Sequence, residues 1–294
     1  MRIKNALVYT VEHGFEERDV RIKNGCFAGS EAAGTDGEEI LDAGGDYLIP
    51  GLVDIHFHGC AGHDFSDGTP EALQAIGAYE LRQGVTSICP ASMTLSEETL
   101  KTVCANAYAY TKRPEAEQDT GARLIGIHLE GPFISMEKKG AQNPAYIRNP
   151  DVEMFLRLQE AAHGLVRLIT IAPETDGAKE FIRRLADQGP CVMIGRCADY
   201  ILAGRPDVVR VFVHADKDFC LEQAMKVDSL PENEVEKKIA EIDEYRARYY
   251  KHHTGHDWYD ARNYDLSLNS GVLGFDGTVE EIIKYMEVRE QFQK

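Results

Sequence analysis

The fold is decided by one stretch, Leu48-Ile49-Pro50-Gly51-Leu52-Val53-Asp54-Ile55-His56-Phe57-His58-Gly59. Its apolar, β-branched run predicts a strand, and side chains alternate across a strand. His56 and His58 are therefore expected on one face of the strand's carboxyl end, with Phe57 on the other face. Two imidazoles in such a position can bind one metal ion. The same spacing also fits two ordinary histidines at the end of a strand.

Working outward from this stretch, strand-like and helix-like segments alternate along the chain as far as residue 189. Thr69 followed by Pro70 is typical of a helix start, and Ser96 followed by two glutamates is another. Further strands are expected at 85–89, 123–129 and 165–172, with helices from 70, from 97 to about 111, at 150–163 and at 177–188. Successive strand-helix units of this size predict half of a (β/α)8 barrel.

The segment before this stretch reads as short strands. They are expected at 3–11, at 19–27 with a turn at Asn24-Gly25, and at 39–48, and the glycine-rich residues 29–37 are expected to form a loop. This pattern predicts a small β-rich part ahead of the partial barrel.

Three motifs resemble a known family. The opening stretch resembles the first barrel strand of the amidohydrolase superfamily. Within that superfamily, Gly59-Cys60-Ala61-Gly62-His63-Asp64-Phe65 and His128-Leu129-Glu130-Gly131-Pro132-Phe133 resemble the N-acetylglucosamine-6-phosphate deacetylase family. The resemblance covers residues 1–189. It implies metal-dependent amide hydrolysis that releases acetate from an N-acetylamino-sugar phosphate, with this small molecule as the partner.

The resemblance also implies the site residues. Glu130 matches a metal ligand of the family, and His56 and His58 match the superfamily's His-x-His pair, so a divalent metal ion is expected, zinc first. Ala141 and Gln142 lie in a loop that resembles the family's substrate loop and are the expected substrate contacts. His128 shares a strand face with Glu130, either as a partner of the ligands or as a structural histidine.

The chain also departs from the family. Where the family has a histidine in a Gly-His-Thr context after the fifth strand, Ile194-Gly195 is followed here by Arg196. Its histidine after the sixth strand and its proton-shuttling aspartate after the eighth strand have no recognisable counterpart, although His214 could imitate a ligand. We therefore assign no catalytic residue and expect impaired hydrolysis.

Residues 190–294 resemble a second family, the cytidylate kinase-like proteins. The resembling motifs are Gly195-Arg196-Cys197-Ala198-Asp199-Tyr200-Ile201-Leu202, Tyr245-Arg246-Ala247-Arg248-Tyr249-Tyr250 and Asn263-Tyr264-Asp265-Leu266-Ser267-Leu268-Asn269-Ser270. The resemblance implies a nucleotide site at Arg196 and Asp199, with Arg246 and Arg248 on a lid-like helix. No phosphate-binding Gly-x-x-x-x-Gly-Lys-Ser/Thr motif is present, so phosphoryl transfer is not expected. The alternative functions are a degenerate nucleotide-binding module or an inactive fusion of two fragments.

The elements of this tail follow from its sequence pattern. Strands are expected at 190–195, 208–214 and 263–270, and helices at 217–227, 232–252 and 279–291. A half barrel would have unpaired edges, so the strands at 191–195 and 208–213 are expected to continue its sheet. Otherwise the chain is expected to form a homo-oligomer through the exposed edge.

Composition limits the classes of partner. A formal net charge of -17 argues against nucleic acid or an anionic membrane as a partner. Seven scattered cysteines do not form a disulfide framework, and no apolar run reaches the length of a membrane span. We expect a cytoplasmic α/β protein with three parts: a β-rich part at 1–50, a partial (β/α)8 barrel at 51–189, and a partial P-loop-kinase-like α/β segment at 190–294.

Overall fold

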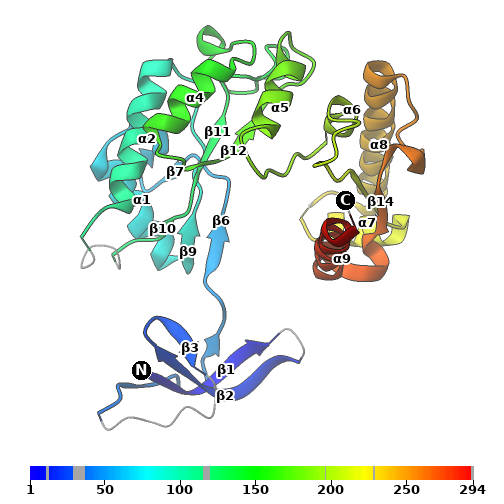
Figure 1. Ribbon diagram of the computed structural model, residues 1–294. Helices are drawn as coiled ribbons and strands as arrows, with labels where there is room; N and C mark the ends of the chain where they lie inside the picture. Colours follow the sequence, from blue (N-terminus) through cyan, green and yellow to red (C-terminus); the bar gives the residue numbers. More distant parts are fainter. Residues whose placement is uncertain (11–12, 29–36, 115–119, 196, 228, 293–294) are drawn as a thin grey trace. The chain divides into compact units, whose positions relative to one another are not determined.

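The computed structural model describes residues 1–10, 13–28, 37–114, 120–195, 197–227 and 229–292 (Figure 1). They form two compact units. The first comprises Met1–Gly131 and Leu156–Thr170, and the second comprises Pro132–Phe155 and Ile171–Lys294. Both units contain helices and strands, which confirms the mixed α/β class. The predicted boundaries at 50 and 189 stay a prediction.

The N-terminal strands of the first unit form one sheet, with β1 hydrogen-bonded to most of its members. The strands are β1 (Arg2–Thr10), β2 (Gly14–Lys23), β3 (Cys26–Ala28), β4 (Ile40–Asp42) and β5 (Tyr47–Leu48), in the order β3-β2-β1-β4 with β5 also on β1. Asn24 and Gly25 both have positive φ, at 54° and 73°, as a tight hairpin turn requires. The loop expected at 29–37 lies, except for Gly37, outside the described residues.

The strands that follow run parallel to one another. They are β6 (Leu52–Asp54), β9 (Val85–Ile88), β10 (Arg123–Leu124), β11 (Ile127–Glu130) and β12 (Val166–Thr170). The order β10-β9-β6 and the pair β11-β12 are joined by a bridge between Ala91 and His128. The neighbours therefore follow chain order, as successive strand-helix units require.

The third predicted strand, at 123–129, divides into β10 and β11 because the chain changes its neighbour there. The Ile125 N–H donates to the carbonyl of Ile88, whereas the Ile127 N–H donates to that of Leu165. A Cβ on the intervening Gly126 would lie 2.5 Å from Cγ of Arg167. The glycine thus permits the close approach at which the exchange occurs.

Two helices of the first unit begin where their caps predict. Thr69 accepts a hydrogen bond from the Ala72 N–H at the start of α1 (Pro70–Arg82), and Ser96 accepts one from the Thr99 N–H at the start of α2 (Glu97–Thr111). The short pair β7 (Gly59–Cys60) and β8 (His63–Asp64) precedes α1, and helix α4 (Val152–Ala161) follows β11 in the chain.

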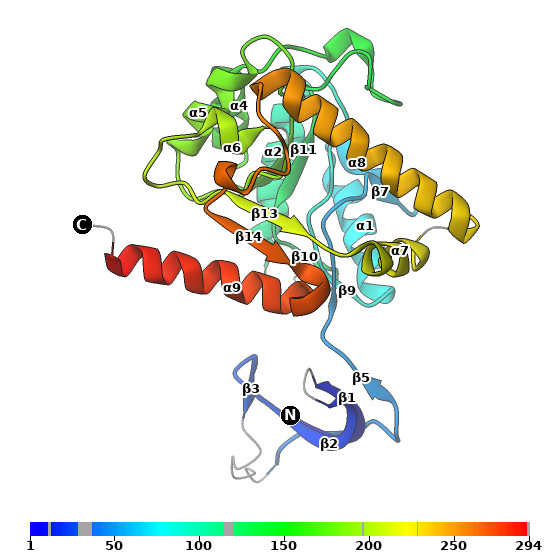
Figure 2. The same ribbon diagram turned by 90° about the vertical axis from the view of Figure 1, so that its right-hand side faces the viewer.

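The second unit contains five further α-helices among its described residues and a two-stranded parallel sheet (Figures 1 and 2). The sheet pairs β13 (Val211–His214) with β14 (Leu266–Asn269). The helices are α5 (Ala178–Ala186), α6 (Ala198–Ile201), α7 (Lys217–Met225), α8 (Glu232–Thr254) and α9 (Ser270–Phe292). Helix α9 starts well before the predicted residue 279 and is interrupted at Gly274, whose φ is 67°.

The prediction of a strand at 190–195 is wrong. Residues 191–195 are irregular, and Val192 and Ile194 are 90% and 91% exposed. Their alternation would favour a strand only with a neighbouring strand to pair with and a core to cover one face. The expected continuation of the barrel sheet by 191–195 and 208–213 is also wrong, because β13 pairs with β14. Self-association through a sheet edge stays a prediction.

Two other predictions concern the whole chain. All seven cysteines carry free thiols, in keeping with the lack of a disulfide pattern. Within the described ranges, no helix is both long enough and apolar enough to cross a membrane.

Candidate metal centre

His56 and His58 lie just beyond the carboxyl end of β6, where the neighbouring chain segment holds their backbone. The Cys89 N–H donates to the carbonyl of Asp54 and the Ala91 N–H donates to that of Phe57, both at 2.8 Å. The Asp54 side chain accepts a hydrogen bond from the His56 N–H at 3.0 Å. These contacts fix the backbone on both sides of His56, although β6 itself ends at Asp54.

The structure brings His56, His58 and Glu130 together as one candidate metal cluster. Glu130 is the last residue of β11, and one ligand atom from each of the three residues lies within 4.8 Å of the other two. Glu130 Oε2 lies 3.5 Å from His56 Nε2 and 3.2 Å from His58 Nε2. Two ligands about 2.1 Å from a tetrahedral zinc ion are about 3.4 Å apart. The separations of the carboxylate from the two imidazoles therefore suit one shared cation.

The hydrogen bond of His58 supports the same conclusion. His58 Nδ1 lies 3.1 Å from the Ala91 carbonyl oxygen, which can only accept, so the ring carries a proton on Nδ1. In the neutral ring, Nε2 then presents a lone pair towards Glu130 Oε2, a solvent-shielded oxygen. Two electron-rich atoms in contact repel unless a positive charge or a proton lies between them. The residues present thus fit a divalent cation.

His128 extends the cluster on the side of His56. Its Nδ1 lies 3.2 Å from His56 Nδ1, and its Nε2 lies 2.9 Å from the hydroxyl oxygen of Thr170. Burial, and after it the neighbouring His56 ring, hold the pKa of His128 below its usual value, although Glu130 and a backbone hydrogen bond with Ile55 oppose the shift. The lowered pKa favours the neutral ring, in which one nitrogen donates and the other accepts.

The backbone at Glu130 is fixed by its neighbours. The Thr94 hydroxyl donates to the carbonyl of Glu130 at 3.3 Å. Gly131 has a φ of +93°, and a Cβ there would lie 2.0 Å from the Thr94 hydroxyl oxygen. Glycine is therefore required at 131 on both conformational and steric grounds.

The other residues implied by the deacetylase resemblance lie in the second unit. Ala141 is exposed and Gln142 is 4% exposed, in a turn where the Gln142 N–H donates to the carbonyl of Lys139. His214 ends β13 and is not a member of the metal cluster found among the described residues. The substrate role of Ala141 and Gln142 stays a prediction.

Of the residues implied by the kinase-like resemblance, Asp199, Arg246 and Arg248 lie among the described residues. Arg196 lies outside the described residues. Asp199 accepts a 2.6 Å hydrogen bond from the Tyr250 hydroxyl. Arg246 and Arg248 lie on α8 and pair with acids one turn earlier in the same helix, Asp243 at 3.1 Å and Glu244 at 3.7 Å. Their nucleotide role stays a prediction.

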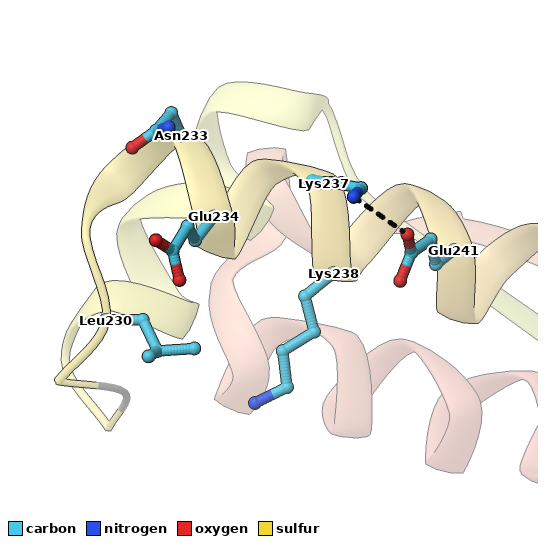
Figure 3. A pocket seen from close by; sticks show the side chains of 6 residues that line it. All are labelled: Leu230, Asn233, Glu234, Lys237, Lys238 and Glu241. Carbon is cyan, nitrogen blue, oxygen red and sulfur yellow. Dashed lines mark ion pairs between the residues drawn. The ribbon is translucent and has the colours of Figure 1, made fainter.

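A groove of about 450 Å³ lies along the first turns of α8 (Figure 3). Its lining residues are Leu230, Asn233, Glu234, Lys237, Lys238 and Glu241. Lys237 and Glu241 form an ion pair at 3.6 Å, so charge within the groove is compensated locally. These residues do not include any member of the metal cluster.

Solved structures define the class of protein that this chain resembles. It matches the N-acetyl-D-glucosamine-6-phosphate deacetylase of Mycobacterium smegmatis with a TM-score of 0.56 and 28% identity, over 73% of this chain and 55% of that chain. A variant of that enzyme in complex with N-acetyl-D-glucosamine-6-phosphate matches with a TM-score of 0.55 and 26% identity, over the same shares.

Individual curated proteins show the same similarity to deacetylases. The N-acetylglucosamine-6-phosphate deacetylase of Bacillus subtilis (strain 168) is 37% identical over 158 residues, 54% of this chain and 40% of that protein. The N-acetylgalactosamine-6-phosphate deacetylase of Escherichia coli O157:H7 is 29% identical over 189 residues, 64% of this chain and 48% of that protein. The chain thus spans about half the length of the curated relatives it matches, or less.

The tail has a different similarity. The model of the cytidylate kinase-like family matches residues 170–272. Both predicted resemblances, to the deacetylases and to the cytidylate kinase-like proteins, are therefore confirmed over parts of the chain.

Two contributors to the cluster, the Ala91 carbonyl and Thr170, are not among the predicted site residues. The Ala91 carbonyl sets the proton of His58 through the backbone, so no side chain marks it. Thr170 was placed only as part of a strand. A signal was available, because successive parallel strands bring their carboxyl ends to one edge, and Glu130 and Thr170 are paired at the ends of β11 and β12.

Proposed function

We propose that this chain is a metal-dependent amidohydrolase of the N-acetylglucosamine-6-phosphate deacetylase type, acting on an N-acetylamino-sugar phosphate. The observation that carries the proposal is the convergence of His56, His58 and Glu130 on one point at the carboxyl end of parallel strands. This edge is where proteins with parallel strand-helix units place their chemistry. The similarity to deacetylases supports the choice of substrate class.

The residues of the cluster would share the work as follows. His56 Nε2, His58 Nε2 and Glu130 would hold the divalent ion, for which zinc is the proposed identity. The chemistry that such an ion supplies is Lewis-acid activation of the acetamide carbonyl and of water. Water adds to the acetamide, the C–N bond breaks, and acetate and the free amine leave.

Slow turnover is part of the proposal. The family's later histidines and its proton-shuttling aspartate have no recognisable counterpart in the sequence, and general acid–base catalysis is worth about 10²–10⁴-fold in rate. We therefore propose no residue of this chain as the general acid or base.

The test is acetate release from N-acetylglucosamine-6-phosphate with added zinc, for the parent, Glu130→Gln and Glu160→Gln. Glu160 is an exposed residue on α4 and serves as the matched control. Zinc-dependent acetate release by the parent and by Glu160→Gln, lost in Glu130→Gln, would support the proposal. No release by any of the three, or equal release by all, would refute it.

The nucleotide-binding alternative is tested by thermal stability. A transition raised by cytidine monophosphate and unaffected by N-acetylglucosamine-6-phosphate would favour it over the hydrolase. No response to either ligand, with a broad transition, would favour an inactive fusion.

A further inference from the structure

His128 and Thr170 form a chain of polar contacts that leads away from the metal cluster. His56 Nδ1 lies 3.2 Å from His128 Nδ1, and His128 Nε2 lies 2.9 Å from Thr170 Oγ1. Strand register places them, since His128 and Glu130 share one face of β11 and Thr170 pairs with Glu130 at the end of β12. Neither residue is among the three clustered ligands.

The proton positions along this chain depend on one another. A neutral imidazole has one N–H and one lone pair. His56 faces Glu130 through Nε2, so this nitrogen can bind a cation only while the proton of the ring is on Nδ1. The nitrogen that faces this proton, His128 Nδ1, accepts it only while the proton of His128 is on Nε2. That N–H then donates to the Thr170 hydroxyl oxygen.

We propose that His128 and Thr170 are positioning residues that select the metal-binding tautomer of His56, an inference that rests on the proposed metal centre. Without the cation, the opposite arrangement satisfies the same contacts. His128 Nδ1–H then donates to His56 Nδ1, and His56 Nε2–H donates to Glu130. In that state the Thr170 hydroxyl donates to His128 Nε2.

The hydroxyl of Thr170 suits this role because it can both donate and accept. Each ring keeps one proton in both arrangements, and only the nitrogen that carries it changes. Half of the His56 side chain is exposed, at 54%, so solvent can exchange its proton during the change. Loss of a partner that fixes a ligand's tautomer typically weakens metal binding 10- to 100-fold.

The first measurement is zinc affinity, by calorimetric titration of the full chain with zinc alone. We expect Thr170→Val, which replaces the hydroxyl with a methyl group, to weaken zinc binding about 10-fold or more. Thr170→Ser keeps the hydroxyl and is expected to bind within about 3-fold of the parent. His163→Gln is a histidine control, because His163 stacks on Tyr108 outside the cluster, and its affinity should equal that of the parent.

The second measurement reads the protons directly in the parent, by long-range ¹H–¹⁵N correlation of ¹⁵N-histidine-labelled protein. With zinc bound, we expect His56 to carry its proton on Nδ1 and His128 to carry its proton on Nε2. This readout does not depend on how well Thr170→Val folds, and it does not require turnover.

The outcomes separate this inference from the proposed function. Unchanged zinc affinity in a folded Thr170→Val, or a zinc-bound parent in which His128 keeps its proton on Nδ1, would overturn the positioning role of His128 and Thr170. Either result would leave the metal centre intact. A parent that binds no zinc would refute the metal centre and, with it, the positioning role of His128 and Thr170. A parent that binds zinc and releases no acetate would refute the hydrolase function without contradicting that positioning role.

Discussion

Replacing Gly131 with alanine tests whether the backbone after Glu130 is as constrained as its geometry indicates. The φ of +93° is costly for a residue with a Cβ, by about 1–3 kcal/mol. The added Cβ would also lie 2.0 Å from the Thr94 hydroxyl oxygen and 3.1 Å from Thr94 Cβ. Overpacking of this kind costs a further 1–3 kcal/mol, roughly, so we expect a total of about 3–4 kcal/mol.

Gly84→Ala is the matched control within the same unit. Gly84 has a φ of +83° but no atom within 4 Å of an added Cβ, so it carries the conformational cost without the clash. We expect Gly84→Ala to lose about 1–2 kcal/mol. The difference of about 2 kcal/mol between the two variants measures the contact with Thr94.

The assay is urea unfolding followed by circular dichroism, with hydrogen exchange at residues 127–131 to localise the loss. In a Thr94→Ala background, the cost of Gly131→Ala should fall by about 1–2 kcal/mol, because the oxygen that the Cβ meets is gone. Equal costs for Gly131→Ala and Gly84→Ala, or an unchanged cost in the Thr94→Ala background, would refute the steric argument.

Two further predictions concern ion pairs and a buried hydroxyl. Hydrogen bonds from Arg157 and Lys101 lower the pKa of Glu97 from 4.5 to about 2, so the stability they give is present above pH 4.5 and is lost as the pH falls towards 2. Urea midpoints from pH 6 to 2 should therefore converge for the parent and Glu97→Gln at the acid end, and a constant difference would contradict this. The Tyr250 hydroxyl donates to Asp199 from a ring that is 4% exposed. Tyr250→Phe should thus lower the free energy of unfolding by about 1–3 kcal/mol. The control is Arg248→Ala, which removes an exposed ion pair with Glu244 and should cost under about 1 kcal/mol. The reverse ranking would show that the Tyr250 hydroxyl contributes little.

Local sequence signals predicted much of the first unit because local physics decides those elements. The caps at Thr69 and Ser96 satisfy amide groups within one turn, and both helices begin where these residues predict. The turn at Asn24-Gly25 needs two residues that tolerate positive φ, and the sequence supplies them. The convergence of His56, His58 and Glu130 is consistent with the ligand set inferred from the resemblance.

The failures share a different cause, which is dependence on a partner distant in the chain. Val192 and Ile194 have the alternation of a strand, yet no strand edge among the described residues pairs with them. The β13 strand was expected to pair with the strands of the predicted barrel. It pairs instead with β14, which lies more than fifty residues later in the chain. Alternation specifies which face is buried, and it does not specify which strand is the neighbour.

The backbone that follows β9 explains why the metal cluster can form from histidines beyond the end of a strand. The Ala91 N–H donates to the carbonyl of Phe57, between the two histidines, and the Ser92 N–H donates to the carbonyl of His128. One short segment therefore holds both sides of the cluster, and the Ala91 carbonyl also sets the proton of His58. Because these contacts use main-chain groups, the side chains at 91 and 92 need only fit their space, and both residues are fully buried. The geometry of His56, His58 and Glu130 is thus set in part by residues that are not candidate ligands themselves.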